Sequence, residues 1–126
     1  MMNKKRPKHL ALHKIKLPLP GFVSILHRIS GMFLFLSLPL LLWMLQASLR
    51  SIETYTQLQE ILQHPLSKLA VLGVLWSFLH HFCAGIRYLA LDLHLGSSLR
   101  KARASSWWVM GTSLLLTVVI GGRWLC

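Results

Sequence analysis

Long apolar stretches separated by short polar segments are the main pattern along this chain of 126 residues. Three stretches, residues 29–49, 66–91 and 105–122, each approach or exceed the roughly 20 helical residues that cross a bilayer. The first and third carry no charge, and Pro39 in the first is tolerated where neighbouring helices satisfy the freed backbone groups. The pattern therefore predicts an all-α integral membrane protein with three transmembrane helices.

Short polar segments connect these spans. Residues 50–65 are typical of a short surface helix ending at Pro65, and residues 92–104 are typical of a polar turn. Residues 1–28 form a basic segment that leads into the first span. No connection is long enough to fold by itself, so we expect residues 1–126 to form a single membrane-anchor domain.

The composition agrees with a membrane protein and changes the choice of partners. Apolar residues make up 54% of the chain and charged residues only 13%, whereas soluble domains are about 25% charged. The net charge is +11, and the basic residues lie at the ends of apolar runs. A nucleic-acid-binding protein instead carries a basic face on a soluble scaffold. We therefore expect a lipid bilayer and no nucleic acid as partner. The two cysteines suggest neither a disulfide framework nor a zinc site.

Positive charge is unevenly distributed between the two sides of the predicted membrane. Eleven of the fourteen Lys and Arg residues lie before the first span or around the end of the second, and only Arg50, Lys68 and Arg123 lie on the opposite side. Because cytoplasmic segments are rich in Lys and Arg, we expect a cytoplasmic N-terminus and loop 92–104, with a periplasmic connection 50–65 and C-terminus. No cleaved signal or organelle-targeting leader is expected. The simplest location is a bacterial inner membrane.

The stretch HHFCAGIRYLALD, residues 80–92, places polar groups inside the second span. On a helix, His81, Gly85, Tyr88 and Asp92 fall on one face, and His81 lies about 16 Å from Asp92, near the bilayer midplane. A glycine one turn from an imidazole leaves the flat opening that a porphyrin needs, and imidazole is a usual axial ligand of haem iron. The spacing fits equally well a histidine that hydrogen-bonds to a neighbouring helix.

A second polar cluster, SILHRISG, lies at residues 24–31, at the entrance to the first span. Ser24 and Arg28 are one helical turn apart, and so are His27 and Gly31. A single snorkelling arginine is common at a membrane boundary. The added hydroxyl and imidazole favour a ligand with anionic or carbonyl groups, such as haem propionates or a quinone head group, because arginine pairs with carboxylates and serine donates to carbonyl oxygens.

The two clusters together resemble a known family. The segments RPKHLALHKIKLPLPGFVSILHRISG and HFCAGIRYLALD are similar to the cytochrome b subunit of succinate dehydrogenase, the larger membrane anchor of complex II. That family carries SI-x-HR-x-SG before its first span and H-x-x-x-G-I-R with a downstream aspartate in its second. Both motifs occur here in the same order on a chain with three predicted spans. The third span matches in hydropathy alone.

The resemblance implies a role for each candidate residue. His81 would be an axial ligand of the iron of haem b, with the second axial histidine supplied by the small anchor subunit. His27 and Arg28 would lie near the haem propionates, and Ser24 and Arg28 would bind the quinone, ubiquinone or menaquinone. The N-terminal segment 4–20 would lie against the iron–sulfur subunit.

Two positions depart from the family pattern. Members often have histidine where this chain has Tyr88, and His80 places a second imidazole beside His81. The spacing to Gly-Ile-Arg favours His81 as the ligand, and we expect His80 to be a packed or hydrogen-bonded helix residue.

The function implied is that of a subunit without catalytic residues of its own, in a complex with a flavoprotein, an iron–sulfur and a small anchor subunit. That complex passes electrons from succinate to quinone in the tricarboxylic acid cycle and aerobic electron transport. Two alternatives stay open: a fumarate reductase anchor, and a small haem-free transporter or scaffold subunit. A proton-coupled transporter favours an acid inside a span, whereas the three acids here, Glu53, Glu60 and Asp92, lie outside or at the edges of the spans.

Overall fold

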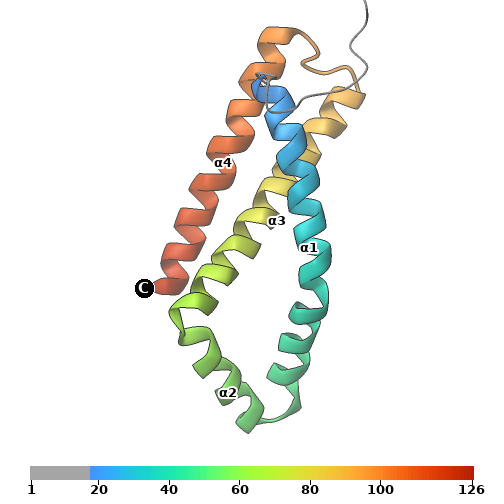
Figure 1. The fold of residues 1–126 in the computed structure, drawn as a ribbon. Coiled ribbons are helices and arrows are strands. Elements are labelled where there is room, and N and C mark those ends of the chain that lie inside the picture. The colour runs from blue at the N-terminus through green and yellow to red at the C-terminus, as the bar shows by residue number, and fades with distance from the viewer. Residues whose placement is uncertain (1–17) are drawn as a thin grey trace, which may run out of the picture.

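The computed structural model describes residues 18–126, and in this part of the chain all regular structure is helical (Figure 1). The order is α1 (Leu19–Arg50), α2 (Ile52–Gln63), α3 (Pro65–Asp92) and α4 (Leu99–Leu125). Helices α1, α3 and α4 are long and apolar enough to cross a membrane. For residues 18–126, the prediction of all-helical structure with three such helices is confirmed. Residues 1–17, and with them most of the predicted basic segment, lie outside the described part.

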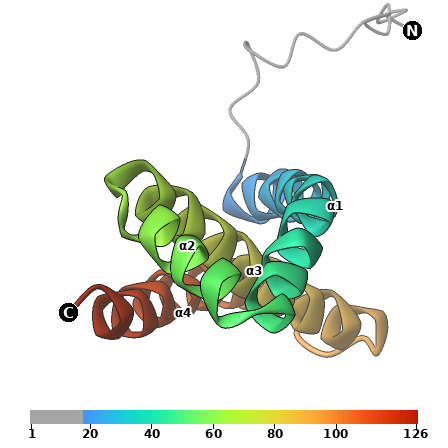
Figure 2. The ribbon, with the colours of Figure 1, turned by 90° about the horizontal axis from the view of Figure 1, so that it is seen from below.

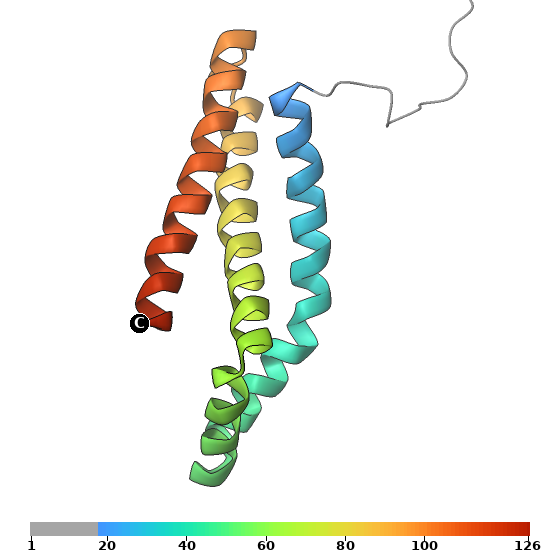
Figure 3. The same ribbon diagram turned by 60° about the vertical axis from the view of Figure 1, so that its left-hand side comes forward.

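The three long helices run along one another, with α3 between α1 and α4 (Figure 3). The beginning of α1, the end of α3 and the beginning of α4 lie at the same end of the bundle (Figure 1), while α2 joins α1 to α3 at the other end, which is nearest the viewer in Figure 2. Because α1 and α3 are antiparallel neighbours, the first turns of α1 lie beside the last turns of α3. This arrangement brings the two polar clusters of the sequence together.

Local hydrogen bonds set the ends of the short helix. Ser51 and Thr54 form a capping box at its start: the Ser51 hydroxyl accepts from the Thr54 amide at 3.1 Å, and the Thr54 hydroxyl accepts from the Ser51 amide at 3.2 Å. The helix ends at Gln63, slightly earlier than predicted, because His64 is extended and Pro65 begins α3. Proline suits a first helical position since its missing amide hydrogen would have no partner there.

Two long helices begin before the apolar runs from which the spans were predicted. Helix α1 begins at Leu19, directly after Pro18, and α4 begins at Leu99, where the Ser98 hydroxyl accepts from the Lys101 amide at 3.4 Å. Residues at the end of the predicted polar turn are therefore helical. The remaining turn is tight, and Gly96 adopts a φ of 68° in the left-handed region that glycine favours.

Most of the buried side chains in the bundle are small. Val23, Ala84 and Val109, one from each long helix, form the buried apolar cluster. The buried hydroxyls, Ser30, Ser37, Ser77, Ser106 and Ser113, donate to backbone carbonyls three or four residues earlier in their own helices. Small residues let helices approach closely in a membrane, and most large apolar side chains are exposed on the outside.

Candidate functional site

The imidazoles of His27 on α1 and His81 on α3 are stacked, in the half of the bundle where α1 begins and α3 ends. Their centroids are 4.2 Å apart and their planes differ by 7°. Gly31, one turn after His27, makes this approach possible, because a Cβ atom at that position would lie 2.8 Å from His81 Cε1. The glycine of the first motif therefore leaves room for the histidine of the second.

The hydrogen bonds of His81 determine which of its ring nitrogens is free. Its Nδ1 lies 3.0 Å from the backbone carbonyl oxygen of His27 and 3.3 Å from Ser30 Oγ. The carbonyl can only accept, so Nδ1 carries the hydrogen and donates to it. The Ser30 hydroxyl donates to the same carbonyl at 2.9 Å, which leaves its oxygen as an acceptor. In a neutral imidazole, Nε2 then keeps its lone pair.

The two interpretations of His81 that the sequence left open, a haem ligand and a histidine hydrogen-bonded to a neighbouring helix, are therefore compatible. The bond to the neighbouring helix uses Nδ1, and it leaves Nε2 available to a metal. Metal-binding histidines usually donate their other ring nitrogen to a carbonyl or carboxylate, which fixes the tautomer and the orientation of the ring. His81 has this arrangement.

A pocket of about 420 Å³ lies beside the stacked imidazoles. Its walls come from His27 and from one face of α3, which presents His81, Phe82, Gly85, Ile86, Tyr88, Leu89 and Asp92. The predicted face of α3 thus forms one wall. A Cβ atom on Gly85 would be 3.9 Å from His27 Nε2, so a larger side chain would extend into the space beside the imidazoles. Phe82, Ile86 and Leu89 are exposed, and the pocket opens on the outside of the chain.

His80 lies in a different environment from its neighbour. It is 0% exposed and stacks on Trp76, with ring centroids 5.1 Å apart. It does not line the pocket that contains His81. Among residues 18–126 neither of its ring nitrogens has a hydrogen-bond partner. The structure thus places His80 inside the helix bundle, away from the opening.

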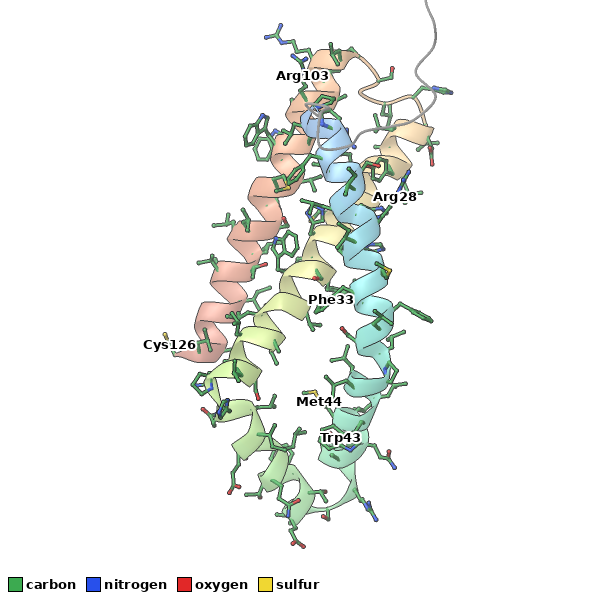
Figure 4. All side chains as sticks on the ribbon, in the orientation of Figure 1. Arg28, Phe33, Trp43, Met44, Arg103 and Cys126 are labelled. Atoms are coloured by element: carbon green, nitrogen blue, oxygen red, sulfur yellow. The ribbon has the colours of Figure 1, made fainter. Side chains whose placement is uncertain are left out.

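Ser24 and Arg28 lie on the first turns of α1, and Figure 4 shows Arg28 toward the end of the bundle where Arg103 also lies. Arg28 is exposed and Ser24 is half-buried. Neither lines the pocket of His27 and His81. The structure therefore brings His27 and His81 together, but it leaves Ser24 and Arg28 outside that pocket.

Sequence reasoning missed two contributors to this region. Ser30 shares an acceptor with His81, and a signal existed in its position three residues after His27, from which a helical serine can reach that carbonyl. Arg87 is only 7% exposed and donates from Nε to Ser105 Oγ at 2.9 Å and from Nη2 to the Ala102 carbonyl at 3.3 Å. Its burial could not be foreseen, because the partners are on α4.

Comparison with known proteins connects this geometry to a family. Residues 2–120 match the family described as succinate dehydrogenase/fumarate reductase transmembrane subunit. The chain is 40% identical over 125 residues to the succinate dehydrogenase cytochrome b556 subunit of Coxiella burnetii, covering 98% of this chain and 99% of that protein. The protein of the same name from Rickettsia felis is 32% identical over 116 residues, covering 92% and 90%. The one from Paracoccus denitrificans is 29% identical over 114 residues, covering 90% and 88%.

These matches run through both polar clusters and all three long helices, and they confirm the resemblance drawn from the two motifs. The chain belongs to the family of succinate dehydrogenase/fumarate reductase transmembrane subunits.

Proposed function

We propose that this chain is the membrane-anchor cytochrome b subunit of a succinate dehydrogenase, which holds haem b jointly with a small anchor subunit and forms part of the quinone-reduction site. The names of the relatives support succinate dehydrogenase over fumarate reductase. The family as a whole includes both enzymes, so a fumarate reductase anchor is the second candidate.

The orientation of His81 carries this proposal. Nδ1 is engaged by the His27 carbonyl, and Nε2 keeps its lone pair beside a pocket of about 420 Å³. Haem iron takes an imidazole nitrogen as an axial ligand. Gly85 has no side chain, so it leaves the space next to the imidazole open. When bound, haem would supply one-electron redox chemistry. Because the pocket opens outward, the small anchor subunit would supply a second histidine and the opposite wall.

His27 and Arg28 are suited to the haem propionates. The His27 ring reaches the same pocket from α1, and the exposed Arg28 follows it at the same end of the bundle. Ring N–H groups and the planar guanidinium both donate to carboxylate oxygens, and arginine does so through two parallel bonds. These two residues would orient the macrocycle relative to His81.

Ser24 and Arg28 are suited to a quinone head group. A hydroxyl and a guanidinium one turn apart can donate to a carbonyl oxygen and stabilise negative charge that develops on it during reduction. The quinone is ubiquinone or menaquinone, and residues of the iron–sulfur and small anchor subunits would complete its site. The chain itself contributes binding and electrostatics, while the redox chemistry belongs to the cofactors.

The proposal also includes an orientation of the chain in a bacterial inner membrane. The end where α1 begins, α3 ends and α4 begins carries Arg28, Arg87, Arg100, Lys101 and Arg103, and the rest of the described chain carries Arg50, Lys68 and Arg123. The positive-inside rule makes the first end cytoplasmic. The iron–sulfur and flavoprotein subunits would then lie at that end. The segment proposed to contact the iron–sulfur subunit, residues 4–20, falls mostly outside the described residues.

The haem spectrum of the purified complex tests the proposal. We expect His81→Leu to remove or strongly change the reduced-minus-oxidised bands, because it deletes the nitrogen proposed to bind the iron. His80→Leu is the matched control, since it replaces a buried neighbouring imidazole with a side chain of similar size, and it should leave the bands nearly unchanged. The reverse result would move the ligand to His80. A wild-type complex without these bands would favour a haem-free scaffold.

A further inference from the structure

A second pocket lies on another side of α3, between α3 and α4, and contains a buried arginine. Its volume is about 330 Å³. Arg87 lines it together with apolar side chains that include Ile86, Leu91, Trp108 and Val109. Trp108 is 75% exposed, so the pocket opens on the outside of the chain, and Ile86 separates it from the pocket of His81. None of the residues assigned above to iron or quinone lines it.

The charge of Arg87 is not balanced inside the described part of the chain. The guanidinium is bonded to Ser105 Oγ and to the Ala102 carbonyl, which are both neutral acceptors. These neutral acceptors, and the Tyr88 ring whose centroid lies 5.3 Å from Arg87 Cζ, offset part of the hydration lost on burial, and an opposite charge would offset more. An anion from outside the chain would provide it, and Arg87 is one of the residues that line this open pocket.

The surroundings of Arg87 distinguish an anionic lipid from a free anion. Arg87 lies little more than one turn before the end of α3, and Trp108 lines the same pocket from α4. Tryptophan is typical of the membrane interface. From there the pocket continues along both helices to Cys83 and Thr112, toward the bilayer centre. A small inorganic anion would leave these apolar walls uncovered, whereas an acyl chain covers them.

We propose that the α3–α4 pocket binds one anionic phospholipid of the surrounding bilayer, with its phosphate on Arg87 and an acyl chain along the apolar walls toward Val109 and Thr112. The exposed Arg100, Lys101 and Arg103 at the start of α4 add positive potential at this end of the bundle. Anionic lipids are attracted by such clusters next to a membrane helix.

Photo-crosslinking tests this site in the assembled complex in phosphatidylcholine vesicles. The probes are a phosphatidylglycerol and a phosphatidylcholine that carry the same photoreactive group near the top of one acyl chain. We expect the anionic probe to label the α4 peptide that contains Trp108 about tenfold more than the zwitterionic probe. A hydrogen bond between charged groups changes a binding constant by about this factor. Arg87→Gln should remove this preference, and Arg87→Lys should keep part of it.

Arg123→Gln is the matched control, since Arg123 is an exposed arginine at the other end of α4, and it should leave the preference intact. Equal labelling by both probes in the wild type would overturn the proposal. If the Arg87→Gln complex does not assemble, competition in the wild type decides. Unlabelled phosphatidylglycerol should suppress labelling, and suppression by inorganic phosphate or by a quinone to the same degree would assign the pocket to those ligands instead.

Discussion

At the scale of single residues, different side chains near the start of α1 and the end of α3 are proposed to bind the iron and the quinone. His81 is oriented by a contact across two helices, with 3.0 Å between its Nδ1 and the His27 carbonyl oxygen. Arg28 is exposed and outside the pocket of that imidazole. The iron-binding and quinone-binding roles proposed for the chain can therefore be separated by substitution.

We expect Ser24→Ala and Arg28→Gln each to lower quinone reduction about tenfold or more, because each removes a donor to the quinone oxygen. Succinate oxidation measured with a soluble artificial dye should persist, since that electron path does not reach the quinone. Ser48→Ala and Arg50→Gln, at the far end of α1, are the controls. Unchanged quinone reduction in both variants would contradict the assignment, and loss of both activities would indicate failed assembly.

Much of the site was predictable at this scale, and the reason is helical periodicity. Positions 81, 85, 88 and 92 share a face on any regular helix, and they line one pocket in the structure. The tautomer of His81 was not predictable, because it depends on a carbonyl of another helix. The burial of Arg87 was not predictable for the same reason, since its partners belong to α4.

At the scale of secondary-structure elements, the distance between α1 and α3 determines how much room the His81 ring has. Gly31 faces the His81 ring, where a Cβ atom would be 2.8 Å from Cε1. The ring is held by its hydrogen bond to α1 and cannot move away without breaking it. Glycine at position 31 therefore fixes both the helix spacing and the position of the imidazole.

We expect Gly31→Ala to shift the His81 ring, change the haem bands and lower the thermal stability of the detergent-solubilised complex, since overpacking costs about 1–3 kcal/mol. Gly73→Ala is the control on α3, because a Cβ atom there has no neighbour within 4 Å, and it should be neutral or slightly stabilising. Equal behaviour of the two variants in the melting curve and the spectrum would argue against this role of Gly31.

The elements themselves were predictable from hydropathy, and their ends were not. An uncharged run long enough to cross a bilayer indicates a membrane helix, but a helix can continue past the apolar run until the backbone is capped. Pro18 and Ser98 precede the actual starts of α1 and α4. The capping box of Ser51 and Thr54 uses a threonine where the common pattern has an acid or amide.

At the scale of the whole molecule, the chain resembles one part of a larger bundle. Its interior holds small residues and hydroxyls, while large apolar side chains cover the outside. The pocket beside His81 opens outward. The partners proposed to close it are other chains, and the sequence of this chain alone does not define them.

The proposed orientation can be tested with the exposed thiol of Cys126 at the C-terminus. We expect a membrane-impermeant maleimide to label Cys126 in spheroplasts, because the positive-inside rule makes this end periplasmic. The half-buried Cys83 inside α3 should stay unlabelled. As a matched control, Ser97→Cys in a Cys126→Ser background should be labelled only in inverted vesicles. The opposite pattern would reverse the topology.

The acceptor that orients His81 is a main-chain oxygen, and the Ser30 hydroxyl bonds to the same atom. A main-chain oxygen is present whatever side chain occupies position 27. Replacing His27 would therefore take its ring out of the pocket, while the atom that sets the tautomer and direction of the His81 imidazole would stay in place.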